Sequence, residues 1–100
     1  DYSEALLEFI TPVEGSVAGV LDQLEKTHRF AYQHLHQERL WVTSMPCIVH
    51  GDDSIPIARY GSSNIGQMKH FYRVGLGSRY GRLMQAIAGI HYNCSLSDDF

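Results

Sequence analysis

Cysteine is scarce in this sequence, and the two cysteines that it has form no recognisable site. Cys47 and Cys94 lie far apart, and no Cys-x-x-Cys pair is present. This pattern implies neither a zinc knuckle nor a disulfide framework. Either cysteine could in principle be a nucleophile, but neither has an evident histidine partner, so we interpret both as packing residues. Reduced thiols are typical of a reducing cytosol, and we therefore expect a cytoplasmic protein.

Long apolar runs and an excess of positive charge are also missing. No stretch approaches the roughly 18 consecutive apolar residues that a membrane-spanning helix needs. The formal net charge is -3, and the basic residues are scattered along the chain. A nucleic acid or an acidic membrane surface would require a basic patch, so we expect no nucleic-acid partner and no membrane partner.

What is present suffices for one small folded domain. The chain has 100 residues, and 44% of them are hydrophobic. Such a chain can bury a single core, and we expect no second domain. It opens on Asp1 without a signal peptide or basic leader, so we expect it to be an internal segment of a longer protein.

Two helices are predicted, on either side of a long irregular connection. Ser16 is a favourable N-cap, and the helical spacing of the apolar residues after it predicts a helix over residues 17–36. Glycine, proline and short polar runs predict irregular chain over residues 37–66. A second helix is expected to begin near Ile65 and to pass Leu76, although three glycines weaken its end.

Two strands are predicted near the ends of the chain. Residues 4–11 contain a Phe-Ile-Thr cluster before a proline. Residues 83–96 alternate between a mainly polar and a mainly apolar set of side chains. The period-two rule then places Glu8 and His91 in the middle of their strands. Two helices with strands at both ends predict the α+β class.

Glu8 and His91 are the side chains in these strands that suggest chemistry. A carboxylate in apolar surroundings is costly unless it finds a cation, so the two groups could converge on one divalent ion if their strands are neighbours. The alternative is that Glu8 is exposed on a one-sided sheet and His91 makes a structural hydrogen bond. The residues alone permit both interpretations.

Other patterns are weaker pointers. Residues 61–64, Gly-Ser-Ser-Asn, precede a helix and resemble an anion-binding turn, but they lack the lysine of a phosphate-binding loop. Arg73, Arg79 and Arg82 could clamp a carboxylate or a phosphate, or could decorate the surface. His34 and His36 lie two apart on a predicted helix and point in different directions, so they cannot share a metal ion.

Several separated blocks of this sequence, in the right order, resemble the proteobacterial type of glutamate–cysteine ligase. The blocks cover essentially the whole chain. They lie at residues 4–12, 44–47, 60–66, 72–73, 79–81, 84–85 and 89–93. The resemblance implies an internal fragment, residues 1–100, of a catalytic domain similar in fold to glutamine synthetase, in which antiparallel strands surround divalent metals.

The resemblance also implies roles for individual residues. Asp1, Glu8 and His91 match metal-ligand positions of the family. Tyr72 matches a tyrosine that holds the incoming cysteine, whereas Gln85 and Ile87 match positions that face the glutamate pocket. Asn93 is a candidate contact to the nucleotide phosphate. No side chain of this chain is assigned as a catalytic nucleophile or base.

The implied reaction joins L-cysteine to the γ-carboxylate of L-glutamate through a γ-glutamyl phosphate, in the first step of glutathione biosynthesis. It would use ATP as co-substrate and Mg²⁺, with Mn²⁺ as a substitute, to offset the repulsion between negatively charged reactants. The fragment should be inactive without the remainder of the catalytic domain, and its exposed edges favour self-association. The alternative is a free-standing, non-catalytic module that binds a metal or an amino acid.

Overall fold

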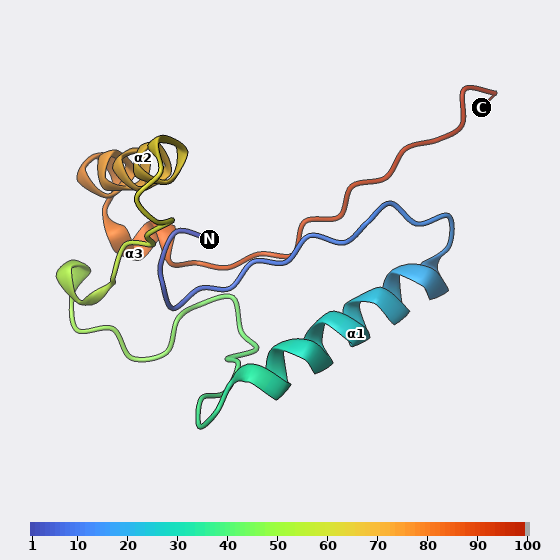
Figure 1. The fold of residues 1–100 in the computed structure, drawn as a ribbon, viewed down its shortest axis with the longest axis horizontal. Helices are drawn as coiled ribbons and strands as arrows, with labels where there is room; N and C mark the ends of the chain where they lie inside the picture. The colour runs from blue at the N-terminus through green and yellow to red at the C-terminus, as the bar shows by residue number, and fades with distance from the viewer. Residues whose placement is uncertain (100) are drawn as a thin grey trace.

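Three α-helices and one 3-10 turn are the regular elements of the computed structural model, which describes residues 1–99 (Figure 1). The elements are α1 (Val17–His34), η1 (Asp52–Ser54), α2 (Asn64–Tyr80) and α3 (Arg82–Gln85). In Figure 1, α2 and α3 lie close to η1, whereas α1 runs apart from them beside the extended chain. The C-terminal residues reach away from both groups.

The predicted α+β class, with its antiparallel strands, is wrong for this chain. Within residues 1–99 the strand-like pairing consists of one antiparallel bridge, between Ser3 and Ile57. Residues 4–11 form a turn and then an extended run, and residues 83–96 begin inside helix α3 before they become extended. A strand needs a neighbour that takes its backbone donors and acceptors, and alternation of side chains does not provide that neighbour.

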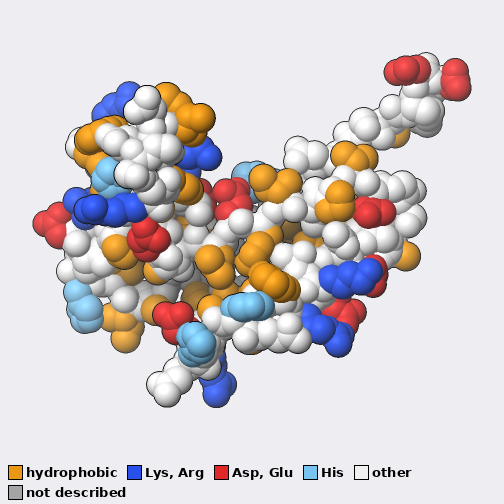
Figure 2. Space-filling model, viewed as in Figure 1, with side chains coloured by type: hydrophobic (Ala, Val, Ile, Leu, Met, Phe, Trp, Pro, Cys, Tyr) orange, Lys and Arg blue, Asp and Glu red, His pale blue; other side chains and the backbone are white. Residues whose placement is uncertain are grey.

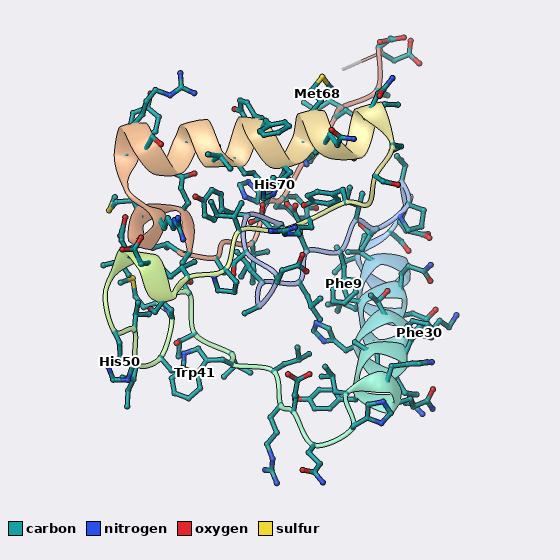
Figure 3. The ribbon with its side chains drawn as sticks, turned by 60° about the vertical axis from the view of Figure 1, so that its left-hand side comes forward. Phe9, Phe30, Trp41, His50, Met68 and His70 are labelled. Carbon is teal, nitrogen blue, oxygen red and sulfur yellow. The ribbon has the colours of Figure 1, made fainter. Side chains whose placement is uncertain are left out.

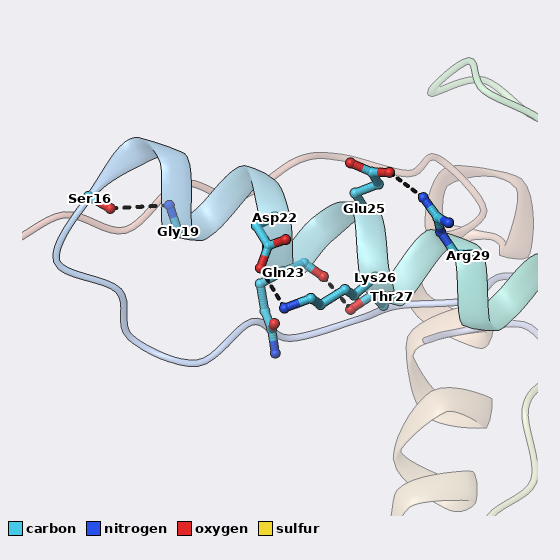
Figure 4. A network of polar contacts seen from close by, with 8 residues as sticks. All are labelled: Ser16, Gly19, Asp22, Gln23, Glu25, Lys26, Thr27 and Arg29. Carbon is cyan, nitrogen blue, oxygen red and sulfur yellow. Dashed lines mark hydrogen bonds and ion pairs between the residues drawn. The ribbon is translucent and has the colours of Figure 1, made fainter.

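Helix α1 begins where the sequence predicts. Ser16 Oγ accepts a hydrogen bond from the Gly19 N–H at 3.1 Å, which satisfies one free donor of the first turn. The helix ends at His34, two residues before the predicted boundary. Figure 4 shows that its ion pairs join side chains one turn apart, including Glu25 and Arg29.

Helix α2 also begins as predicted and continues further than its glycines suggest. Ser63 caps it by accepting from the Gly66 N–H at 3.1 Å, and the helix runs through Gly75 to Tyr80. It ends at Gly81, whose φ of +81° is a conformation that favours glycine. The chain then turns directly into α3. No helix among residues 1–99 combines the length and the apolarity that crossing a bilayer demands.

The buried core is small and lies under α2. Tyr2, Ile55 and Ala58 are its buried apolar residues there, whereas α1 buries only Ala31. The molecule exposes 8735 Å² of surface, while a compact monomer of this mass exposes roughly 5,700 Å². Its radius of gyration is 16.4 Å, compared with about 13 Å for a compact domain of 100 residues.

Many large hydrophobic side chains are exposed, including part of the predicted apolar face of α1. On that face, Val17 and Leu21 are 70% and 61% exposed. Figure 2 shows hydrophobic side chains gathered at the surface between the part that contains α2, α3 and η1 and the part that contains α1. The helical period was therefore predicted correctly, but within residues 1–99 the face that it defines is only partly covered: Ala31 is buried and Val20 and Leu24 are half-buried.

Candidate functional site

A pocket of about 260 Å³ opens between the N-terminal segment (residues 1–4), α2 and α3. Its lining comes from the first two residues and from two neighbouring stretches much later in the chain. The residues are Asp1, Tyr2, Tyr72, Arg73, Leu76, Met84, Gln85 and Ile87. Contacts between distant segments must therefore build this site.

The first contact docks the N-terminal segment on residues 56–58. The Ala58 N–H donates to the Tyr2 carbonyl at 2.9 Å, and the Glu4 N–H donates to the Pro56 carbonyl at 3.1 Å. The Glu4 carboxylate in turn accepts from the Arg59 N–H at 2.6 Å. These bonds flank the bridge between Ser3 and Ile57 and hold the first residues in place beneath α2.

The second contact fixes Asp1 against α2. The Asp1 carbonyl accepts from the Tyr60 hydroxyl at 2.6 Å and from Arg73 Nε at 3.0 Å. The Arg73 guanidinium also lies over the Tyr60 ring, 4.6 Å from its centroid, in a cation–π arrangement. His70 points from α2 toward the chain below it, and its Nδ1 lies 2.8 Å from the Ala58 carbonyl (Figure 3).

The third contact holds α3, which carries the opposite side of the pocket. The Asp52 carboxylate accepts from the Arg82 N–H at 2.6 Å and from the Leu83 N–H at 3.0 Å. These two backbone hydrogen bonds lower the pKa of the Asp52 carboxyl from its ordinary value, because they favour the charged form. Asp52 is therefore anionic at neutral pH, where an anion suits the start of a helix.

Tyr2 forms the buried floor of the site. Its side chain is 3% exposed, and its hydroxyl has no hydrogen-bond partner among the described residues. Burial is the largest cause that raises the pKa of Tyr2, partly offset by the positive charge of Arg82. The close approach of Tyr2 to α2 requires a glycine, because a Cβ at Gly77 would lie 2.5 Å from Tyr2 Oη.

Four of the predicted site residues meet in this pocket, and three do not line it. Asp1, Tyr72, Gln85 and Ile87 are among its lining residues. The other three, Glu8, His91 and Asn93, are exposed side chains on the extended segments. Among residues 1–99, no group of three or more acidic, histidine or cysteine side chains is placed to hold a metal ion.

Four lining residues were missed as part of the site, although the sequence held signals for them. Leu76 follows Tyr72 by four residues, so the two share a helix face. Arg73 was left open between a ligand clamp and a surface residue. Tyr2 and Met84 each adjoin a predicted site residue, but adjacency in sequence does not reveal which of two neighbours points inward.

Other sequence candidates have simpler places. In the turn at residues 61–64, the Ser63 side chain and carbonyl already accept from the Gly66 and Gln67 N–H groups, which leaves fewer donors for an anion. Cys47 and Cys94 are free and exposed, so their interpretation as packing residues is wrong within the described chain.

The polar lining of the pocket suits a small molecule with charges of both signs. Asp1 supplies a carboxylate and Arg73 a guanidinium, while Tyr72 and Gln85 supply neutral donors and acceptors. Arg73 donates from Nε to the Asp1 carbonyl and from Nη1 to the Lys69 carbonyl. Because a guanidinium has five N–H groups, others are left for a ligand. Pockets for drug-sized ligands measure roughly 300 to 1,000 Å³, so a pocket of about 260 Å³ is of a size for a smaller molecule.

Comparison with known proteins adds an independent finding. The sequence matches the family model described as "Glutamate-cysteine ligase" over residues 1–100. It is 62% identical over 98 residues to a glutamate–cysteine ligase of Pseudomonas putida, which covers 98% of this chain and 19% of that protein. It is 58% identical over 100 residues to the ligase of Alcanivorax borkumensis, covering all of this chain and 19% of that protein.

A third relative agrees with these two. The glutamate–cysteine ligase of Shewanella oneidensis is 58% identical over 99 residues, covering 99% of this chain and 19% of that protein. The chain thus spans about a fifth of the length of the curated relatives that it matches. The resemblance inferred from the separated sequence blocks is confirmed by these comparisons.

Proposed function

We propose, from the premise that this chain belongs to the glutamate–cysteine ligase family, that residues 1–100 form the part of a catalytic domain that binds an amino-acid substrate. The complete protein would join L-cysteine to the γ-carboxylate of L-glutamate with ATP, in glutathione biosynthesis. The single observation that carries this proposal is the convergence of Asp1, Tyr72, Gln85 and Ile87 on one pocket.

The proposed reaction is an ATP-dependent ligation. The terminal phosphoryl group of ATP passes to the γ-carboxylate of glutamate, and the cysteine amine then displaces phosphate from this acyl phosphate. In this scheme the residues of the pocket bind and orient. Arg73 is placed to pair with an amino-acid carboxylate, whereas Tyr72 and Gln85 hydrogen-bond the substrate. Fixed orientation makes the encounter effectively unimolecular, which lowers the barrier.

A direct test uses the full-length enzyme and one hydroxyl. Tyr72→Phe removes a hydrogen bond worth about 1 kcal/mol, so the KM for cysteine should rise about fivefold. The KM for ATP should change less than the KM for cysteine. Tyr80→Phe is the matched control, because Tyr80 lies on the same helix, is similarly exposed and does not line the pocket.

The outcomes show whether or not Tyr72 contacts the substrate. A rise in the cysteine KM with Tyr72→Phe but not with Tyr80→Phe supports the assignment of Tyr72. Equal kinetics in the two variants would show that Tyr72 does not contact the substrate. If the full-length wild-type protein consumes ATP without joining the two amino acids, the proposed ligase activity itself is wrong.

The proposal includes a divalent cation, Mg²⁺ with Mn²⁺ as a substitute, for which Asp1, Glu8 and His91 are the candidate ligands. Carboxylate oxygens suit either cation, whereas an imidazole is a more typical ligand of softer divalent metals. When bound, the cation would neutralise phosphate charge. These side chains do not fit a complete metal site by themselves, since no group of three gathers among residues 1–99, and further donors would have to come from elsewhere.

Glu8 gives the sharpest test of the cation assignment. Glu8 is exposed on extended chain, so Glu8→Ala should leave the fold intact. It should nevertheless abolish ligation in the full-length enzyme and weaken Mn²⁺ binding, measured by electron paramagnetic resonance. Near-normal turnover together with unchanged Mn²⁺ binding would remove Glu8 from the ligand set.

Asn93 is proposed to contact the nucleotide phosphate. We therefore expect Asn93→Ala to raise the KM for ATP.

The remaining parts of the proposal concern location and partners. Free, exposed cysteines are compatible with a reducing cytoplasm, where we place the protein. Its partners are L-glutamate, L-cysteine, ATP and the remainder of the catalytic domain. We expect that remainder to cover the exposed apolar side chains between α1 and the part that contains α2, α3 and η1. Without that remainder, the same surface would favour self-association of the segment.

A further inference from the structure

The short helix α3 has little means of holding its own position. It comprises only Arg82–Gln85, and one turn of helix is unstable in isolation because a single turn fixes several dihedral angles for few hydrogen bonds. It comes directly after Gly81, whose φ of +81° reverses the direction of the chain after α2. Something outside α3 must therefore determine where its residues lie.

Asp52 supplies that external support from 30 residues earlier in the chain. Its Oδ2 accepts from the Arg82 N–H at 2.6 Å, and its Oδ1 accepts from the Leu83 N–H at 3.0 Å. Both oxygens thus satisfy donors of the first turn that no helical carbonyl can reach. A charged acceptor makes these bonds stronger than neutral ones.

A reciprocal contact ties the same two segments together. Arg82 Nη1 donates to the Ile55 carbonyl at 3.2 Å, and Ile55 is buried. The turn η1 that carries Asp52 is itself fixed, because the Ser54 hydroxyl and N–H both donate to the Gly51 carbonyl, at 2.7 and 3.2 Å. Asp52 is therefore anchored to a rigid turn on one side and to α3 on the other.

The position of α3 determines where three lining residues of the pocket lie. Met84 and Gln85 belong to α3, Ile87 lies two residues beyond its end, and all three line the pocket. We propose that Asp52 is a positioning residue for the amino-acid pocket, which acts by capping α3 and thereby fixing Gln85 and Ile87. This inference rests on the proposed function, since the pocket is assigned there to a substrate amino acid.

The chain offers a matched control in the adjacent residue. Asp53 has the same charge and lies in the same turn, but its side chain is fully exposed and its ion-pair distance to Arg82 is 3.9 Å. It accepts no backbone hydrogen bond from α3. Removal of Asp53 therefore changes the local charge as much as removal of Asp52 while it leaves the cap intact.

The experiment compares Asp52→Ala, Asp52→Asn and Asp53→Ala in the full-length enzyme. Steady-state kinetics are measured with glutamate, cysteine and ATP varied in turn. In Asp52→Ala the KM of an amino-acid substrate should rise about tenfold, because small misplacement of a binding group is costly, while the KM for ATP and kcat change about twofold or less. Asn keeps one acceptor oxygen and is a good cap, so the KM in Asp52→Asn should lie between those of the wild type and Asp52→Ala.

The result expected for Asp53→Ala is wild-type kinetics for all three substrates. A loss in Asp52→Ala that lowers kcat and leaves each KM unchanged would indicate a smaller fraction of folded enzyme and would overturn the proposal. Equal effects of the Asp52 and Asp53 variants would overturn it as well, because charge and not capping would then be responsible.

A second measurement keeps this inference separate from the proposed function. Amide hydrogen exchange of residues 82–88 in the same full-length proteins should accelerate in Asp52→Ala and not in Asp53→Ala. If the wild-type enzyme shows no ligase activity, the proposed function fails. The exchange data then decide the positioning role alone, and unchanged protection in Asp52→Ala would end it.

Discussion

The corner formed by α2, α3, η1 and the N-terminal segment is held together differently from helix α1. In the corner, hydrogen bonds join residues far apart in sequence, such as Tyr60 with Asp1 and Arg82 with Asp52. In α1, the side-chain hydrogen bonds and ion pairs join residues three or four positions apart, as Figure 4 shows for Ser16 with Gly19 and for Glu25 with Arg29.

This difference explains why the pocket lies where it does. A binding site needs groups from several segments held in fixed relation, and within residues 1–99 most of the hydrogen bonds between distant segments lie in the corner. Helix α1 makes no contact with α2, α3 or η1 among residues 1–99, so whatever packing it has is against irregular chain and is slight, with Ala31 as its one buried residue. Its exposed apolar face is the surface that we expect the remainder of the protein to cover.

The largest expected effect comes from Gly77, where the N-terminal segment approaches α2. Gly77→Ala would place a methyl group 2.5 Å from Tyr2 Oη and 3.2 Å from Arg82 Cγ. Because the Tyr2 ring is buried, it cannot move aside freely, and we expect a loss of about 1 to 3 kcal/mol of local stability. Hydrogen exchange of α2 amides in the full-length protein measures this loss.

Gly75→Ala is the control on the same helix. The added methyl group would have one neighbour within 4 Å, the end of the Arg79 side chain at 3.9 Å. Removal of a helical glycine should then stabilise α2 by up to about 1 kcal/mol. If Gly75→Ala and Gly77→Ala destabilise α2 equally, the contact with Tyr2 is not what makes the corner sensitive.

An intermediate effect should distinguish the two regions through the same kind of cap. Ser16→Ala and Ser63→Ala each remove a serine that accepts from a backbone N–H at 3.1 Å, at a cost of about 1 kcal/mol. In α1, which contacts no other helix among residues 1–99, protection should fall over several turns. In α2, whose His70 and Arg73 contact other segments, the loss should stay in the first turn.

Exchange mapped along each helix tests this difference, with Ser16→Asp and Ser63→Asp as variants that keep a cap. An equally long stretch of lost protection in α1 and α2 would contradict the comparison. Confinement of both losses to one turn would contradict it too, since it would show that α1 is supported as firmly as α2 in the full-length protein.

The smallest effect is expected for the surface pair of Glu25 and Arg29 on α1. Arg29→Gln removes one exposed ion pair between residues one turn apart, which is worth about 0.5 kcal/mol or less. The difference from wild type should shrink in 1 M salt, because screening weakens exposed pairs. A larger, salt-independent loss of α1 protection would show that Arg29 contacts something outside this segment.

Much of the helical structure and part of the site could be predicted from the sequence. The capping serine and the apolar period located α1, and the run after Ile65 located the start of α2 to within a residue. Four pocket residues were named because the resemblance to a known family implied roles for them. The roles of Glu8, His91 and Asn93 were named in the same way and remain predictions.

The strands and the cap of α3 were not predictable from local pattern. Alternating side chains over residues 83–96 suggested a strand, but the Asp52 carboxylate, 30 residues away, stabilises a helical turn at its start. The Tyr2 ring likewise determines why Gly77 is needed in a helix that glycine should weaken. Both features depend on pairs of residues that no short window of sequence contains.

By itself, the sequence determined the two long helices, the cap of the first and the family, because capping, helical period and recognisable blocks are properties of short stretches. The tertiary structure alone decided that the N-terminal segment, α2 and α3 enclose one pocket and that the extended segments form no sheet within residues 1–99. The physical reason is that backbone donors and charged side chains take whichever partners the folded chain brings within hydrogen-bond distance.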